Sequence, residues 1–156
     1  MKKLLIGVGI AGIALGGWKL HSHSTVVDRD GGKLVADRIW IDHMPRNERD
    51  TINAFLALTS DPLGVFQATS RWQGQFELFK YEQRGNEIRA VFPHTGSKET
   101  FKTKARECSE KGFDFCLELD GGKHGVKRYY SMEGWDIGNA ADAQQKILKI
   151  ETDATK

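Results

Sequence analysis

The chain has 156 residues, of which 23 are basic and 21 acidic, so its formal net charge is +2. This near-neutral balance, without a long block of like charge, argues against a nucleic-acid-binding protein and against a polybasic membrane patch. The length predicts a single domain with one modest core.

The first residues predict export. Lys2 and Lys3 form a positive start, and residues 4–17 are apolar and uncharged. Small residues follow where a signal peptidase would cut, which is typical of a signal peptide. Even with residues 18–20 the apolar run is shorter than the ~20 residues of a comfortable membrane span. Cleavage is therefore favoured, and an inner-membrane anchor formed by residues 4–20 is the alternative.

The same segment contains a second pattern. Gly7, Gly9 and Gly12 spell G-x-G-x-x-G, the turn that holds a pyrophosphate in dinucleotide-binding folds. Such a turn works only within a βαβ unit, and no alternation of strands and helices follows it in the sequence. The three glycines are interpreted as part of the export signal, and no cofactor is expected.

The chain is divided accordingly. We expect a signal peptide or anchor at 1–24, a linker at 25–36, one β domain with a C-terminal helix at 37–150, and a frayed tail at 151–156. The positive start keeps the N-terminus in the cytoplasm and places the rest outside it, in the periplasm or in the extracellular space. Membrane contact is expected only through the N-terminal segment, if it remains uncleaved.

The central region predicts an all-β fold. Short apolar runs alternate with turn residues, which favours an antiparallel meander of eight strands, closed as a barrel or folded as a sandwich. Residues 47–58 also show tolerable helical spacing, so a helix is the alternative there. The expected strands are 37–44, 51–59, 64–72, 75–83, 87–93, 100–108, 113–119 and 126–132.

Charge predicts the register of one hairpin. A two-residue turn at Gly85-Asn86 sets opposite charges across the ladder, which stabilises it, and places aromatic residues together on the other face. The expected pairs are Arg84 with Glu87, Glu82 with Arg89, Phe79 with Phe92, and Tyr81 with Ala90.

The two cysteines predict a disulfide, because exported chains meet oxidising conditions. A three-residue turn around Gly112 sets Cys108 opposite Cys116, near the roughly 5.5 Å Cα separation of a disulfide. Two free thiols are the alternative for a chain in a reducing compartment. The same register pairs Lys104 with Asp120 and Arg106 with Glu118, and collects on the opposite face Phe101, Ala105, Phe113, Phe115, Leu117 and Leu119.

The tail from residue 138 changes to helix-forming residues. Asn139 is a suitable N-cap. Apolar side chains then fall near one helical stripe, which predicts a short helix docked on the sheet. Its members are Ala140, Ala143, Ile147 and Ile150.

No enzyme motif is visible. The densest polar stretch, residues 42–50, holds His43 among acidic and basic residues, so acid–base chemistry is conceivable there. A charged turn explains the stretch equally well. His21 and His23 form an H-x-H pair without an apparent third ligand, so no metal site is expected.

Aromatic residues are numerous for a small domain, and most are expected in the core. The mouth and interior of an eight-stranded barrel can also hold one small molecule. We therefore expect a small, partly apolar ligand at Phe79, Tyr81, Phe92 and Tyr130.

Eight short antiparallel strands followed by a helix resemble the calycin architecture of lipocalins. The resemblance covers residues 37–150 and rests on strand count and order. The G-x-W signature of lipocalins is absent, because Trp40 follows Asp37-Arg38-Ile39. No residue role is therefore carried over from that family.

These observations favour an exported, non-enzymatic protein of the cell envelope that binds a small, partly apolar ligand in a β-barrel. The alternative is an envelope module, tethered or free, that binds another protein through a strand edge or an aromatic patch. A hydrolase with a site around His43 is the least favoured hypothesis.

Overall fold

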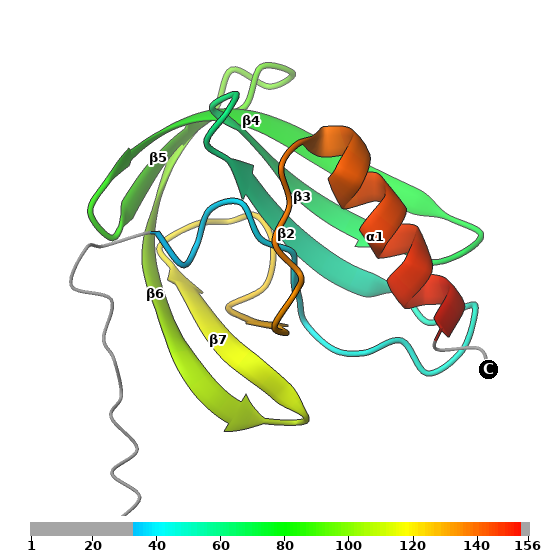
Figure 1. Ribbon diagram of the computed structural model, residues 1–156. Helices are drawn as coiled ribbons and strands as arrows, with labels where there is room; N and C mark the ends of the chain where they lie inside the picture. The colour runs from blue at the N-terminus through cyan, green and yellow to red at the C-terminus, as the bar shows by residue number, and fades with distance from the viewer. Residues whose placement is uncertain (1–32, 154–156) are drawn as a thin grey trace, which may run out of the picture.

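The computed structural model describes residues 33–153, so the segment expected to be a signal peptide or anchor lies outside the described residues. The described part contains eight strands and one helix (Figure 1). The elements are β1 (Trp40–Ile41), β2 (Ile52–Leu58), β3 (Leu63–Thr69), β4 (Gly74–Arg84), β5 (Glu87–Val91), β6 (Lys98–Glu110), β7 (Phe113–Asp120), β8 (Arg128–Ser131) and α1 (Ala140–Asp153).

The eight strands form one closed antiparallel sheet in chain order. Each strand pairs with the next, and β1 closes the ring by pairing with β2 on one side and β8 on the other. The closing strand has only two residues, and Ile41 opposite Tyr130 is its register pair with β8. The predicted all-β meander of eight antiparallel strands with a C-terminal helix is confirmed, and its strands close into a ring.

The helical alternative for residues 47–58 is wrong, because Ile52–Leu58 forms β2. This strand is buried on both faces. Phe55 and Ala57 point into the closed sheet, whereas Leu56 and Leu58 belong to a second cluster outside it. A strand covered on both faces has no polar alternation, which is why its periodicity was ambiguous.

The first hairpin has the predicted register. Arg84 opposes Glu87, and Tyr81 opposes Ala90, across the turn between β4 and β5. The rings of Phe79 and Phe92 lie 5.5 Å apart inside the sheet. Gly85 takes a φ of 59°, the left-handed conformation that a tight two-residue hairpin requires.

The second hairpin does not have the predicted register. Its turn has two residues, Lys111 and Gly112, whose φ values are 55° and 84°. As a result Lys104 opposes Glu118 rather than Asp120, and Arg106 opposes Cys116. The strands are offset by two positions from the expected pairing.

The register shifts at a β-bulge between Glu107 and Glu110, which leaves Cys108 outside the paired ladder. The Cα atoms of Cys108 and Cys116 are nevertheless 5.8 Å apart, and the two sulfurs form the predicted disulfide. Phe113, which follows the bulge, lies outside the interior. Its ring stacks at 5.1 Å on Tyr130 in the outer cluster, contrary to its predicted place with Phe101 and Leu117.

The interior of the sheet is filled by side chains. Phe66 lies at the centre, and its ring centroid is 5.2 Å from those of Phe55 and Phe79 and 5.4 Å from that of Phe101. Aromatic contacts at these distances are typical of a packed core. Gly64 is required here, because a Cβ on it would lie 2.1 Å from the Phe79 ring.

The core begins earlier than the sequence suggested. Val35, at the end of the predicted linker, is 1% exposed and accepts a hydrogen bond from Trp40 Nε1 at 2.9 Å. These contacts make the last linker residues part of the domain.

Helix α1 lies outside the closed sheet, over its β2–β3 side (Figure 1). Asn139 Oδ1 accepts a hydrogen bond from the backbone N–H of Asp142 at 3.0 Å, which confirms the predicted N-cap. Ala143 and Ile147 are buried beneath the helix. The helix continues to Asp153, so the first residues of the expected frayed tail are helical.

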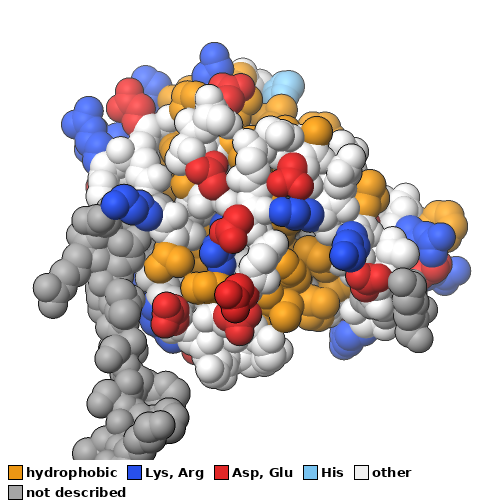
Figure 2. Space-filling view, viewed as in Figure 1, with side chains coloured by type: hydrophobic (Ala, Val, Ile, Leu, Met, Phe, Trp, Pro, Cys, Tyr) orange, Lys and Arg blue, Asp and Glu red, His pale blue; other side chains and the backbone are white. Residues whose placement is uncertain are grey.

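The surface carries both signs of charge. Acidic and basic side chains alternate over the face shown in Figure 2, with small hydrophobic patches between them. This pattern agrees with the near-neutral composition. Among residues 33–153 no helix has the length and apolar character needed to span a bilayer.

Candidate functional site

The four aromatic residues predicted to bind a ligand lie in two different places. Phe79 and Phe92 are fully buried inside the sheet, and Tyr81 is 9% exposed there, with its hydroxyl donating to Leu58 O at 2.9 Å. Tyr130 faces outward, into the cluster beneath α1. The structure therefore does not bring the four together, and none of them lines the groove described next.

A groove of about 650 Å³ lies between α1 and the outer faces of β2, β3 and β4. Its floor is a row of aliphatic side chains that face each other across the strands. Leu56 opposes Val65 on β3, and Val65 opposes Leu78 on β4. Leu56 is buried, whereas Val65 and Leu78 are only partly buried, so the floor becomes more open towards β4.

The helix supplies the other wall. Gln144, Leu148 and Glu151 are spaced by four and three residues, so they share the helix face beside the buried stripe. Leu148 is 54% exposed above the floor. Near the start of the helix, Ala143 lines the groove with a small side chain, which leaves space between the helix and the sheet.

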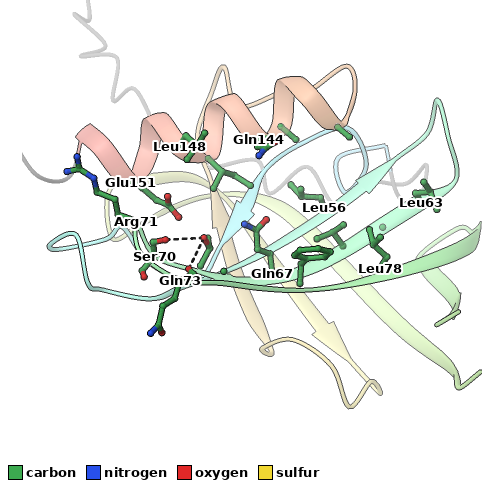
Figure 3. Close-up of a pocket in the computed structure, with 18 of the residues that line it drawn as sticks. Leu56, Leu63, Gln67, Ser70, Arg71, Gln73, Leu78, Gln144, Leu148 and Glu151 are labelled. Atoms are coloured by element: carbon green, nitrogen blue, oxygen red, sulfur yellow. Dashed lines mark hydrogen bonds between the residues drawn. The ribbon is translucent and has the colours of Figure 1, made fainter. Parts of the chain in front are cut away.

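The two ends of the groove differ in polarity (Figure 3). One end is apolar and contains Leu56, Leu63 and Leu78. The other end contains Ser70, Arg71, Gln73 and Glu151, around the turn between β3 and β4. The site therefore fits a molecule with an apolar body and one polar end.

Two large rings line the groove without being buried by it. Trp72 is 67% exposed and Phe76 is 66% exposed, although most aromatic residues of this domain are in the core. Exposed rings beside an apolar groove are typical of a binding surface.

The polar end holds a carboxyl group with one unpartnered oxygen. Glu151 is 5% exposed, and its Oε1 has no hydrogen-bond partner among the described residues. Buried polar atoms are nearly always paired, so this oxygen is unusual.

The polar stretch around His43 forms a closed network of ion pairs. His43 Nδ1 lies 2.8 Å from Asp42 Oδ1, and Nε2 lies 3.4 Å from Asp50 Oδ2. Asp42 also accepts hydrogen bonds from Asn53. Hydrogen bonds from Arg46 hold the pKa of Asp50 well below its usual range. Both imidazole nitrogens face carboxylates, an arrangement that fastens this loop to β2.

A second histidine closes one end of the sheet. His124 lies 3.0 Å from Glu77 and 2.9 Å from Glu99, and its ring stacks on Phe92 at a centroid distance of 4.1 Å. Burial alone would raise the pKa of Glu99, but hydrogen bonds from Lys123 and His124 outweigh it, and the pKa is lowered. His124, held by the two carboxylates and stacked on Phe92, therefore caps the aromatic core.

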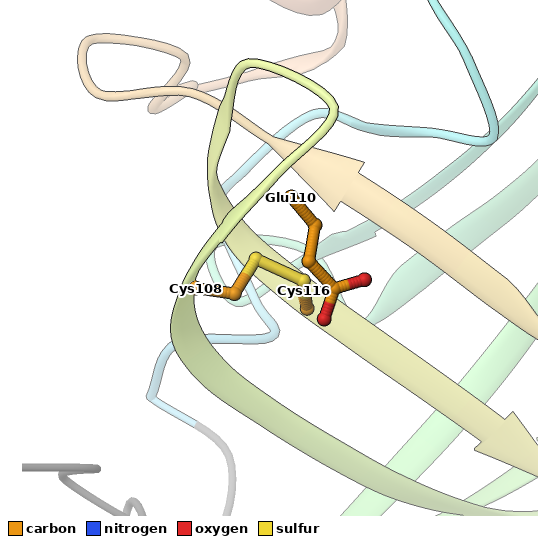
Figure 4. Close-up of side chains that lie close together, drawn as sticks. All are labelled: Cys108, Glu110 and Cys116. Carbon is orange, nitrogen blue, oxygen red and sulfur yellow. A yellow bond between two sulfur atoms is a disulfide. The ribbon is translucent and has the colours of Figure 1, made fainter. Parts of the chain in front are cut away.

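One group of possible metal ligands lies at the second hairpin, where Glu110 approaches Cys108 and Cys116 (Figure 4). The two sulfurs are joined in the disulfide, so neither is available as a thiolate, the form that binds metals. The group is a structural crosslink with a neighbouring carboxylate.

Sequence reasoning missed the groove. Its helix residues repeat at helical spacing from residue 140 to 151, and Glu151 is charged whereas the other lining residues of the helix are Ala, Gln, Ile and Leu. This charge was the available signal. The partner strands could not be identified from the sequence, because nothing local shows on which strands the helix docks.

No protein-family model matches this chain, and no curated protein or solved structure is similar enough to it to count as a match.

Proposed function

We propose that this chain is an exported, non-enzymatic protein that binds a small, partly apolar ligand in the groove between α1 and strands β2–β4. The observation that carries the proposal is the groove itself, about 650 Å³ with an aliphatic floor and one polar end. Small-molecule sites typically measure about 300–1,000 Å³ and combine apolar walls with a few polar groups.

The proposed ligand lies outside the closed sheet rather than within it. The interior position is disfavoured because Phe66 and its aromatic neighbours occupy the axis at centroid distances of 5.2–5.4 Å. The ligand would instead cover the half-open floor at Val65 and Leu78. This position replaces the one expected at Phe79 and Phe92.

Export is supported by the N-terminal sequence pattern and by the disulfide, since disulfides persist in oxidising compartments. We propose a periplasmic or extracellular location. Cell fractionation and the N-terminal mass of the recovered protein test this part. A reduced protein of full-length mass in the cytosolic fraction would contradict it.

The sheet also supports a calycin-like architecture, as in lipocalins. Eight antiparallel strands in sequential order, closed by β1 and followed by a helix, are consistent with it. Lipocalin-like folds usually place the ligand inside, whereas the proposed site here is outside. The function is therefore argued from the groove and not from the architecture.

A non-enzymatic role is proposed because the polar stretch around His43 has a structural explanation. His43 Nδ1 lies 2.8 Å from Asp42 and Nε2 lies 3.4 Å from Asp50, contacts that hold the loop against β2.

The proposal is tested with N-phenyl-1-naphthylamine, a neutral probe that fluoresces in apolar surroundings. We expect saturable binding by the native protein. Phe76→Ser and Leu148→Asp should each weaken it roughly tenfold or more, because either change removes a large apolar contact. Both side chains are mostly exposed, so the fold should survive.

Val91→Ser is the matched control, because Val91 is 40% exposed on β5, away from the groove. It should bind the probe like the native protein. Binding that Phe76→Ser and Leu148→Asp leave unchanged would place the ligand elsewhere, and no binding at all would exclude the proposed function.

Trp72 and Phe76 favour a second candidate, an envelope module that covers these rings with another protein. Both rings are about two-thirds exposed, at 67% and 66%. A photo-crosslinking residue at position 72 would then capture one discrete envelope protein in cells. The small probe would not bind the purified protein.

A further inference from the structure

The polar end of the groove contains a carboxyl group that the fold itself does not use. Glu151 points from α1 towards the sheet (Figure 3). It is 5% exposed, and its Oε1 lacks a hydrogen-bond partner in the described part of the chain. An oxygen buried in this way destabilises the protein unless a donor reaches it.

The position of Glu151 on the helix makes its carboxylate still less favourable for stability. It lies in the last turn of α1, where the partial charge of the helix end is negative, and that turn has no basic residue. A carboxylate is unfavourable at this end. Neither packing nor helix electrostatics therefore explains why an acidic residue stands here.

The cation that lines the same end is already engaged. The guanidinium of Arg71 pairs with Glu48, and its Cζ lies 5.6 Å from the centroid of the Trp72 ring. The groove thus offers one open acceptor, Glu151 Oε1, and one exposed ring, Trp72, among its lining residues. A carboxylate oxygen and an aromatic ring in one groove suit a cation, because the oxygen accepts hydrogen bonds and ring faces attract positive charge.

We propose that the groove binds a cationic amphiphile, a protonated amine that carries an alkyl or aryl tail. This inference rests on the proposed function and specifies its ligand class. The ammonium group donates hydrogen bonds to Glu151, and the tail lies along Leu56, Val65 and Leu78 towards the apolar end. Charge-assisted hydrogen bonds of this kind are among the stronger ones in proteins.

Three probes with the same tail test the head group at pH 7. Decylammonium, decanol and decanoate each compete with N-phenyl-1-naphthylamine for the native protein. We expect decylammonium to displace it at roughly tenfold lower concentration than decanol, a difference of about 1.4 kcal/mol. Decanoate should be the weakest, because its charge meets that of Glu151.

Glu151→Gln keeps the shape of the side chain and removes its charge, so the preference for decylammonium over decanol should disappear. Glu133→Gln is the matched control, because Glu133 is exposed in the turn before α1. It should keep the full preference.

Two results would overturn the inference while leaving the proposed function intact. Equal competition by decylammonium and decanol, with the neutral probe still bound, would show that the head group is not recognised. A preference for decanoate would show that Arg71 selects the head group. Failure of the neutral probe to bind at all would instead reject the proposed function.

Discussion

At the residue scale, the conspicuous feature is a side chain that stability alone would not retain. Glu151 is buried, lacks a partner for one oxygen, and sits at the negative end of a helix. Proteins keep such residues at functional sites, where local rules are broken for binding or chemistry. The burial of Glu151 therefore supports the proposal that a ligand binds at the polar end of the groove.

This view predicts that removing the carboxyl stabilises the unliganded protein. Glu151→Leu should raise the free energy of unfolding by about 1–2 kcal/mol, because an unpaired buried oxygen is replaced by an apolar group. Urea unfolding of the purified protein measures the change. Glu133→Leu, on an exposed site, should alter stability by less than about 0.5 kcal/mol. A loss of stability in Glu151→Leu would reveal a stabilising contact at Oε1.

At the element scale, the β6–β7 hairpin shows why charge alone did not fix the register. Lys102, Lys104 and Arg106 repeat at every second position, so a shift by two residues replaces one set of opposite-charge pairs with another. Lys104 finds Glu118 after the shift, in place of Asp120. The turn residues decided between the two, because Lys111 and Gly112 form a tight two-residue turn.

The disulfide locks this hairpin at its bulge. Replacing Cys108 and Cys116 together by serine should lower the free energy of unfolding by about 2–3 kcal/mol, as expected when a short loop is no longer closed in the unfolded chain. Their sequence separation is 8 residues. Denaturant unfolding tests this, with the native protein under reducing conditions as the comparison. Equal stability of the oxidised and serine proteins would mean that the bulge is held without the crosslink.

In the first hairpin the charge pattern allows only one register, because alternate charges on β4 differ in sign, whereas Lys102, Lys104 and Arg106 on β6 are all positive. Its charges differ in sign between Glu82 and Arg84 on one strand, so a shift by two would set like charges opposite each other. Sequence reasoning about a ladder succeeds where neighbouring pairs alternate in sign.

At the scale of the whole molecule, closing the sheet around aromatic rings makes stability sensitive to alkaline pH. Burial raises the pKa of Tyr81 to about 12, and it raises that of Tyr129 to about 12 as well. The unfolded tyrosine ionises near ~10. The folded protein keeps both protons over this interval, so its stability falls as pH rises from about 10 to 12.

The measurement that tests this is the free energy of unfolding as a function of pH between about 10 and 12. Each of the two tyrosines should steepen the decline by up to about 1.4 kcal/mol per pH unit. Tyr81→Phe should make the decline of the unfolding free energy with pH less steep, by the contribution of one tyrosine. The variant also loses the hydrogen bond to Leu58 O, which lowers stability at every pH without changing the slope. An unchanged slope in this variant would show that Tyr81 ionises as readily in the folded protein as in the unfolded one.

Closure of the sheet also explains why the candidate site lies outside the sheet and not in its interior. Once Phe66 and its neighbours fill the interior, the apolar surface that remains is outside, where α1 covers only part of β2–β4. Three of the four aromatic residues predicted to bind a ligand, Phe79, Tyr81 and Phe92, are part of the interior core for this reason. The exposed Trp72 and Phe76 were in the sequence as well, but nothing local separated them from the buried rings.

Local patterns predicted seven of the eight strands without an alternative, the first hairpin, the capped helix and the cysteine pair, because each depends on contacts between residues close in the chain. The closure of the sheet through β1 and β8, the strands on which α1 docks, and the burial of Glu151 with one unpartnered oxygen depend on contacts between distant residues. The closure, for example, pairs Ile41 near the start of the domain with Tyr130 near its end. Local propensity and periodicity carry no information at that separation.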